Sequence, residues 1–351
     1  MDLKQHKKYF SSLGLRFFIG GIVIYAAQIL AVVLVMVFNR KLVNNGNAQI
    51  LLSLIPMYLI GIPVLALLVT RMPAEPPLKR DLKPSEFICS FLMGYSLMIG
   101  SNLIVTVIGT IIDNLIPGAD TTATDIGSIV SETSPWLLCF CTVICAPLIE
   151  EFVFRKLIVD RTARQYGEGT AVVLSGLMFG LFHGNASQGT YATFLGFILA
   201  YLYARTGKLK VTIAIHMIVN FLGSFAALFL MKMLNLDDSQ MDALLSGDTT
   251  QIASIFMDNL GVMIFYIAYI ALICCMVIAG FVILIVFLVK KKFVFAKGRY
   301  TIPKGKRFST VILNVGMILF FLFHIGEILV SMFQNILGDV ISNLVTSLTG
   351  G

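Results

Sequence analysis

The chain has 351 residues, of which 58% are hydrophobic and only 13% are charged, and its mean hydropathy is +0.90. A soluble domain of this length would carry about a quarter charged residues, so the composition excludes a soluble globular protein. The net charge of +7 does not indicate nucleic-acid binding, because the basic residues lie in short clusters between apolar runs.

Nine apolar runs follow one another along the chain, most of them close to the ~20 residues that a helix needs to span a bilayer. We therefore expect an all-α protein, a polytopic transmembrane helical bundle with about eight or nine spans. Glycine and polar residues interrupt the runs between 136 and 204. The expected spans are 17–38, 50–70, 87–112, 136–156, 170–188, 190–204, 210–231, 262–289 and 309–334.

The connecting segments alternate in charge. Basic residues occupy the N-terminus and the segments 71–83, 155–164, 205–210 and 290–307, whereas 113–135 and 234–259 contain acidic residues and no Lys or Arg. This alternation predicts a cytoplasmic N-terminus and basic cytoplasmic loops that contact anionic lipid headgroups. The first apolar run lacks a small-residue cleavage site, which favours a retained helix over a signal peptide. We expect an integral, multi-pass protein of a plasma membrane, bacterial in our interpretation.

The sequence suggests three regions. Residues 1–86 would comprise the N-terminal cytoplasmic segment, two leading helices and the Pro-rich linker "RMPAEPPLKRDLKP". Residues 87–232 would form the transmembrane core, and residues 233–351 an acidic outer loop with two C-terminal helices. The outer loop is expected to carry a short surface helix.

Few ionisable residues fall within the predicted spans. Intramembrane ionisable groups are costly, which makes them candidates for function. The set, with one polar companion, is Glu150, Glu151, Arg155, His183, His216, His324, Glu327 and Asn220.

Two adjacent carboxylates stand at the centre of this set. Glu151 lies four residues before Arg155, the favourable order for a helical ion pair, and we expect the two to stabilise the fold. Adjacent helical residues point about 100° apart, so Glu150 cannot share that partner equally. Glu150 would be an unpaired buried carboxylate suited to act as a general base, or a carboxyl held neutral by a local hydrogen bond.

Two further predicted helices carry polar groups. His183 follows Gly176 and Gly180, and together with Gly184 these form a small-residue stripe that would bring His183 against another helix. His216 and Asn220 are four residues apart and would share one helix face, where both could donate hydrogen bonds to an oxyanion. Packing or interhelical hydrogen bonding is the alternative interpretation for both sets.

Taken together, a carboxylate base, a histidine and a donor pair supply the roles that amide hydrolysis needs. The sequence contains no HExxH zinc motif, no pair of aspartates within an apolar run and no GxSxG serine elbow. A glutamate-based site is the chemistry that remains.

These residues also resemble a known family. "EEFVFR" (150–155), "FGLFH" (179–183) and "HMIVN" (216–220) fit EExxxR, FxxxH and HxxxN, the three ordered motifs of the CPBP family of CAAX proteases and bacteriocin-processing enzymes, also called Abi. The resemblance, which covers roughly 135–225, implies an intramembrane catalytic cavity in the helical bundle. It implies that Glu150 activates water with His183, that His216 and Asn220 stabilise the oxyanion, and that Glu151 and Arg155 are supporting residues.

No cofactor is expected. A zinc ion is the alternative, since Glu150, His183 and His216 would supply a His₂Glu ligand set with an open position for water.

The predicted function is that of an intramembrane endopeptidase acting on a membrane-associated protein or peptide, such as a CAAX-type C-terminus, a leader peptide or a bacteriocin precursor. The alternative is a non-catalytic membrane protein for bacteriocin self-immunity or for scaffolding other membrane proteins. A transporter is disfavoured because no repeated hydropathy pattern is visible. His324 and Glu327, three residues apart, are expected to form a structural pair.

Overall fold

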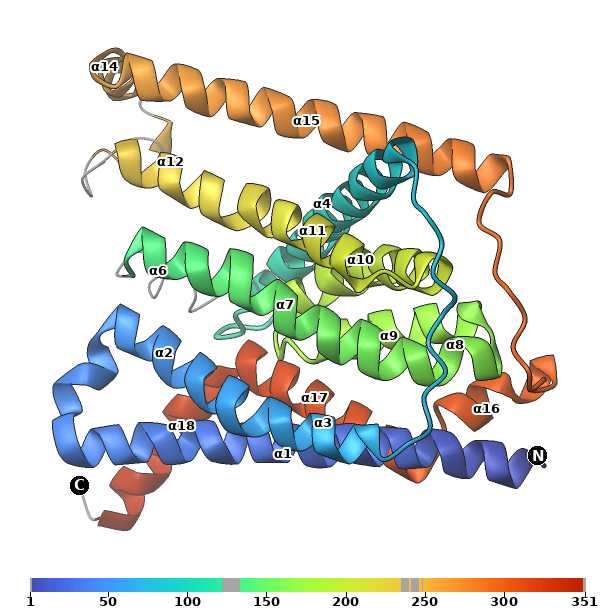
Figure 1. Cartoon of the computed structure of the whole chain (residues 1–351). Coiled ribbons are helices and arrows are strands. Elements are labelled where there is room, and N and C mark those ends of the chain that lie inside the picture. The colour runs from blue at the N-terminus through green and yellow to red at the C-terminus, as the bar shows by residue number, and fades with distance from the viewer. Residues whose placement is uncertain (1, 122–132, 235–239, 241–245, 248, 350–351) are drawn as a thin grey trace.

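The structure is a computed structural model that describes residues 2–121, 133–234, 240, 246–247 and 249–349, and within these ranges it contains helices and no strands (Figure 1). The predicted all-α bundle is confirmed. Its α-helices are α1 (Leu3–Asn39), α2 (Gly46–Pro56), α3 (Ile62–Thr70), α4 (Pro84–Leu115), α6 (Pro135–Cys139), α7 (Ala146–Glu150), α8 (Asp160–Tyr166), α9 (Glu168–Leu181), α10 (Ala186–Thr206), α11 (Leu209–Asn220), α12 (Ala227–Leu234), α14 (Thr249–Asp258), α15 (Leu260–Val289), α16 (Arg307–Val311), α17 (Val315–Met332) and α18 (Gln334–Thr349).

Seven helical stretches of the described residues are long and apolar enough to cross a membrane, and α9 is a shorter apolar helix. The chain is therefore an integral, multi-pass membrane protein, with a number of spans close to the eight or nine expected. The seven stretches are Leu3–Asn44, Gly46–Thr70, Pro84–Leu115, Pro135–Tyr166, Leu209–Leu230, Leu260–Val289 and Val315–Met332.

The two ends of the bundle differ in charge. The N-terminus, the linker 71–83 and the segment 290–306 lie at the same end, and α14 lies at the other (Figure 1). The basic clusters predicted to be cytoplasmic thus share one end of the molecule, as the positive-inside rule requires. That this end faces the cytoplasm stays a prediction.

The first helix begins earlier than its apolar run suggests. α1 starts at Leu3, because the Asp2 side chain accepts a hydrogen bond from the backbone N–H of Gln5 and the Gln5 side chain accepts one from Asp2. This reciprocal capping box satisfies backbone donors that would otherwise be unpaired. The helix thus extends beyond the predicted apolar span 17–38 toward the N-terminus, because capping and not hydropathy sets its boundary.

Helices α1 and α17 pack tightly against each other. A Cβ atom on Gly14 would lie 2.5 Å from the backbone N of Met317, and one on Gly316 would lie 1.8 Å from the carbonyl O of Ser11. Small residues let the two backbones approach this closely. The main core combines residues from both helices with residues from α9 and from the stretch that follows α7: Phe10, Leu13, Phe17, Phe154, Met178, Phe179, Met317 and Phe320.

The division of the chain into the three regions 1–86, 87–232 and 233–351 stays a prediction.

Helices α9 and α10 form a second close pair. A Cβ on Gly176 would meet the Phe197 ring at 2.2 Å, and one on Gly180 would meet Thr193 Oγ1 at 1.8 Å. These two glycines act as the predicted small-residue stripe. Gly184 does not belong to it, because α9 ends at Leu181 and Gly184 has a φ of +62° in the turn that follows. The predicted span 170–188 was therefore too long.

The helix that contains the candidate glutamates is not a regular α-helix. Residues 140–145 and 151–159 are π-helical, and α7 lies between them. Pro147 has no N–H to donate and its ring crowds the carbonyl of Val143, which accounts for the wider turn before it. Residues 221–226, directly after Asn220, are π-helical as well. Irregular turns thus flank the candidate residues on both helices.

The acidic segment 234–259 contains the short helix α14, as expected. Its residues 235–239, 241–245 and 248 lie outside the described part of the chain, as do residues 122–132 of the other acidic segment.

Candidate active site

Glu150 and Glu151 occupy different environments although they are adjacent. The Glu151 side chain is fully buried, whereas that of Glu150 is 26% exposed. Glu150 ends α7 and Glu151 begins the π-helical stretch 151–159. The two carboxylates therefore point in different directions, as the helical geometry predicts.

Glu151 bridges two helices. Its Oε2 lies 3.1 Å from Nε of Arg155, which is the predicted pair at i,i+4. Its Oε1 lies 3.0 Å from Nδ1 of His216 on α11. The sequence indicated the first contact and not the second, because spacing within one helix carries no information about a partner 65 residues away.

The Glu151 contact determines which ring nitrogen of His216 carries a proton. A carboxylate paired with arginine is an acceptor, so Nδ1 of His216 donates to it. The other ring nitrogen, Nε2, lies 3.6 Å from Oε2 of Glu150. His216 is thus held between the two carboxylates, with Nε2 directed at the more exposed one.

His183 lies in the turn after α9 and not within a helix. Its Nδ1 is 2.8 Å from the carbonyl O of Phe179, an acceptor, so this nitrogen is also the protonated one. The ring nitrogens Nε2 of both candidate histidines are therefore left for other partners. Fixing one nitrogen by a backbone or carboxylate acceptor is how proteins set a histidine tautomer.

Phe179 links the polar residues to one another. Its buried ring contacts the rings of His183 and His216 edge-on, at centroid distances of 4.9 and 5.7 Å. The Arg155 guanidinium carbon lies 4.5 Å from the same ring centroid, a cation–π distance. Sequence reasoning gave Phe179 no role, although it is the first residue of the FxxxH motif.

Arg155 is fully buried, and none of its side-chain nitrogens has a hydrogen-bond partner among the described residues. Its ion pair with Glu151 and its contact with Phe179 are the interactions that compensate its charge. A buried arginine in this situation depends on its counter-ion, because an uncompensated charge in the interior is strongly unfavourable.

Asn220 points to a different partner from His216. Its Nδ2 donates to the backbone carbonyl of Thr142, 2.8 Å away in the π-helical stretch before α7. The structure thus places both residues on α11 but gives them separate partners. The Asn220 amide retains a second N–H, since the group has two.

His324 and Glu327 form the predicted pair on α17, with Nδ1 of the histidine 2.6 Å from Oε2 of the glutamate. The His324 ring also contacts Phe182, whose centroid lies 5.1 Å away in the turn that carries His183. The pair packs beside the candidate site without making a polar contact to its residues among those described.

The proposed zinc ligands do not come together as a set. Within the described ranges no three His, Cys, Asp or Glu residues are grouped closely enough to hold a metal ion. Glu150 and His216 are neighbours, whereas the hydrogen bond of His183 is to Phe179. The arrangement does not fit a His₂Glu site, so no chemical step is assigned to a metal. The metal-free interpretation stays a prediction.

Comparison with known proteins agrees with the sequence motifs. Residues 132–222 match the model of the family described as "Type II CAAX prenyl endopeptidase Rce1-like". The chain is also similar to "Putative membrane peptidase YdiL" of Bacillus subtilis (strain 168), with 32% identity over 84 residues, which are 24% of this chain and 34% of the relative. No solved structure matches. The resemblance to CPBP proteases is thus confirmed for this segment, and the chain spans about a third of the length of the relative.

Proposed function

We propose that this chain is an intramembrane endopeptidase that hydrolyses a peptide bond in a membrane-associated protein or peptide. The observation that carries the proposal is the pairing of a partly exposed carboxylate with an oriented histidine: Glu150 Oε2 is 3.6 Å from His216 Nε2. The family match over 132–222, which contains every predicted catalytic residue, supports it.

In the proposed reaction Glu150 removes a proton from water as the water oxygen bonds to the scissile carbonyl carbon. The carbonyl oxygen becomes an oxyanion, which the second N–H of Asn220 is available to stabilise. The C–N bond then breaks, and Glu150 returns the proton to the leaving amine. His183 and His216 contribute through Nε2, because their Nδ1 atoms already donate to Phe179 and Glu151. For His216 to donate to the oxyanion, its Nε2 must carry a proton as well.

The location of the site supports a membrane-associated substrate. Glu150 lies on a segment, Pro135–Tyr166, that is long and apolar enough to cross the bilayer. This location favours a substrate that itself lies in or at the membrane, such as a CAAX-type C-terminus, a leader peptide or a bacteriocin precursor. The plasma membrane of a bacterium is the proposed location.

The test compares membrane-peptide profiles of cells that express wild-type protein, Glu150→Gln and a control variant. Asp258→Asn is suitable as the control, because Asp258 is an exposed acidic residue at the end of α14. Peptides that appear with the wild type and Asp258→Asn, and are absent with Glu150→Gln, support proteolysis. Identical profiles for all three would reject it and favour the non-catalytic role in immunity or scaffolding.

A further inference from the structure

A cavity of about 480 Å³ lies at the end of the bundle that carries the basic clusters, away from the candidate active site. Its walls come from the junction of α8 and α9, the end of α10, the linker 72–83 and the segment 290–303. Figure 1 shows the linker and the latter segment running along this end of the bundle. No part of the proposed peptidase chemistry uses this cavity.

The walls are held in place by backbone hydrogen bonds. In the segment 290–303, Arg299 N donates to Arg164 O at 2.9 Å and Glu168 N donates to Ala296 O at 3.0 Å. In the linker, Arg80 N donates to Thr206 O at 3.0 Å. Gly167, with a φ of +95°, lies so close to this segment that a Cβ would be 3.3 Å from Ala296 O. The cavity is thus a built feature of the fold.

The lining is strongly basic. It contains five basic and two acidic side chains, which are Arg80, Arg164, Arg205, Lys297 and Arg299 against Glu75 and Glu168. An excess of three positive side chains around one concave surface creates a potential that attracts anions.

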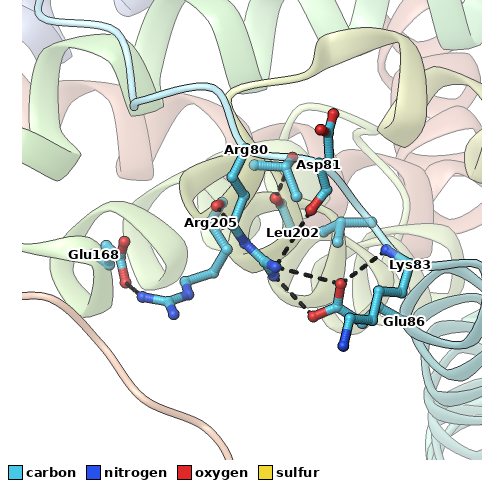
Figure 2. A network of polar contacts seen from close by, with 8 residues as sticks. Arg80, Asp81, Lys83, Glu86, Glu168, Leu202 and Arg205 are labelled. Carbon is cyan, nitrogen blue, oxygen red and sulfur yellow. Dashed lines mark hydrogen bonds and ion pairs between the residues drawn. The ribbon is translucent and has the colours of Figure 1, made fainter.

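Three of the arginines already have acidic partners. Arg299 pairs with Glu75 at 2.8 Å, and Arg205 lies 3.6 Å from Glu168. Arg80 holds Glu86 outside the cavity at 3.0 Å and also donates to the carbonyl of Arg205. Figure 2 shows that the two arginines diverge, with Arg205 directed at Glu168 and Arg80 at Glu86.

The remaining two cations have no such partner. Arg164 and Lys297 line the cavity from two adjoining elements, α8 and the segment 290–303. Within the described part of the chain, neither side chain makes a hydrogen bond or an ion pair. Like charges facing one cavity repel each other, which a bound anion would relieve.

We propose that this cavity binds a phosphate-bearing anion through Arg164 and Lys297. An arginine fork matches the geometry of phosphate oxygens and a lysine adds a point charge. The phosphate group can belong to the headgroup of an anionic phospholipid or to a soluble compound, and the experiment below distinguishes the two. The proposal is independent of the peptidase activity.

The test measures thermal unfolding of the purified full-length protein in a non-ionic detergent at fixed ionic strength. Pyrophosphate, a short-chain phosphatidylglycerol, a short-chain phosphatidylcholine and citrate are titrated separately. A ligand that binds the folded state raises the unfolding temperature in a saturable manner. We expect saturable stabilisation by phosphatidylglycerol, pyrophosphate or both, and none by phosphatidylcholine or citrate.

Two double variants assign the effect to the cavity. Arg164→Gln with Lys297→Gln should raise the half-saturating concentration about tenfold or more, since it removes two charged hydrogen-bond donors. Lys290→Gln with Lys306→Gln removes the same charge at the same end of the bundle but outside the cavity, and should leave binding unchanged. Lys297→Arg keeps the positive charge and should retain binding. If it does, weaker binding in the glutamine variant reflects the lost charge and not a general effect of substitution on folding.

A response to phosphatidylglycerol alone identifies a lipid headgroup as the source, whereas a response to pyrophosphate identifies the phosphate group itself. The proposal is overturned if neither phosphatidylglycerol nor pyrophosphate stabilises the protein, if phosphatidylcholine or citrate acts equally well, or if both double variants weaken binding to the same extent.

Discussion

Glu151 and His216 are joined across two helices by a 3.0 Å contact between Oε1 and Nδ1. Through this contact the carboxylate that stabilises the helix also orients the histidine that faces Glu150. The adjacent glutamates therefore have linked roles: Glu151 positions His216, and Glu150 is the reacting group of the proposed mechanism. Because their surroundings differ, replacing Glu151 by glutamine is expected to affect mainly stability, and replacing Glu150 by glutamine mainly the cleavage rate.

Glu151→Gln should unfold the protein more readily. The variant leaves Arg155 buried without its counter-ion, and breaking such a pair costs about 3–5 kcal/mol. Glu150→Gln removes a partly exposed carboxylate and should leave stability nearly unchanged while lowering the cleavage rate about 10²- to 10⁴-fold. Thermal unfolding of both purified variants measures the effect on stability. The rate at which each variant cleaves a substrate identified from the membrane-peptide profiles measures the effect on activity. Equal loss of stability in the two variants would contradict this assignment.

Phe179→Leu should lower the cleavage rate, because the polar side chains that contact the Phe179 ring would no longer be held in place. The substitution removes the ring that contacts His183, His216 and Arg155. Phe17→Leu makes the same change in volume at a fully buried position of the same core and serves as the matched control. Both variants should lose stability by similar amounts, and cleavage should fall about tenfold or more only in Phe179→Leu. Parallel losses of cleavage would reduce Phe179 to a packing residue.

Gly180→Ala should strongly destabilise the protein. The added Cβ would approach Thr193 Oγ1 to 1.8 Å and the backbone O of Gly189 to 2.3 Å, so α9 and α10 would have to separate. Gly326→Ala in α17 meets nothing within 4 Å and should be neutral or slightly stabilising, because alanine favours helices by up to about 1 kcal/mol over glycine. The unfolding temperatures of both variants test the close approach of α9 to α10 at Gly180, and similar values would refute it.

The pair His324–Glu327 should be replaceable as a unit. His324→Leu alone leaves a carboxylate without its partner in a largely buried position and should cost several kcal/mol, whereas His324→Leu with Glu327→Leu should regain most of that loss. A double-mutant cycle on thermal unfolding measures the coupling. Cleavage should remain near the wild-type level in the double variant. A double variant that is stable but inactive would instead give the pair a part in function.

Chelation should leave cleavage unchanged. The described His, Cys, Asp and Glu residues form no group of three that could hold a metal ion. Treatment with a strong zinc chelator, followed by elemental analysis of the purified protein, separates metal loss from activity loss. Cleavage that disappears with the chelator and returns with added zinc would assign the site to a metal.

The sequence was sufficient to predict an all-α bundle of apolar helices and one ion pair of the candidate site, because both depend on local signals, whereas the catalytic roles of the site residues stay predictions. Hydropathy located the spans, and the spacing of Glu151 and Arg155 predicted their ion pair. The contact of Glu151 with His216 could not be predicted, since it joins residues from separate helices.

The misplaced end of α9 had a local signal that hydropathy obscured. Gly184 adopts a positive φ just after the helix, and the Asn185 side chain accepts a hydrogen bond from Gln188 N to begin α10. A glycine followed by an N-capping asparagine is a stop-and-start signal. It moves His183 from a helix into a turn, where its Nδ1 donates a hydrogen bond to the Phe179 carbonyl.

The close packing of α1 against α17 has a consequence for how the protein is made. Residues 40–314 must leave the ribosome before α17 can cover the face of α1 that it occupies. Phe182, next to His183, then gains its contact with His324. The packing around the candidate site is thus completed only after the ribosome has made α17, and this face of α1 waits for its partner while all the helices between them are made.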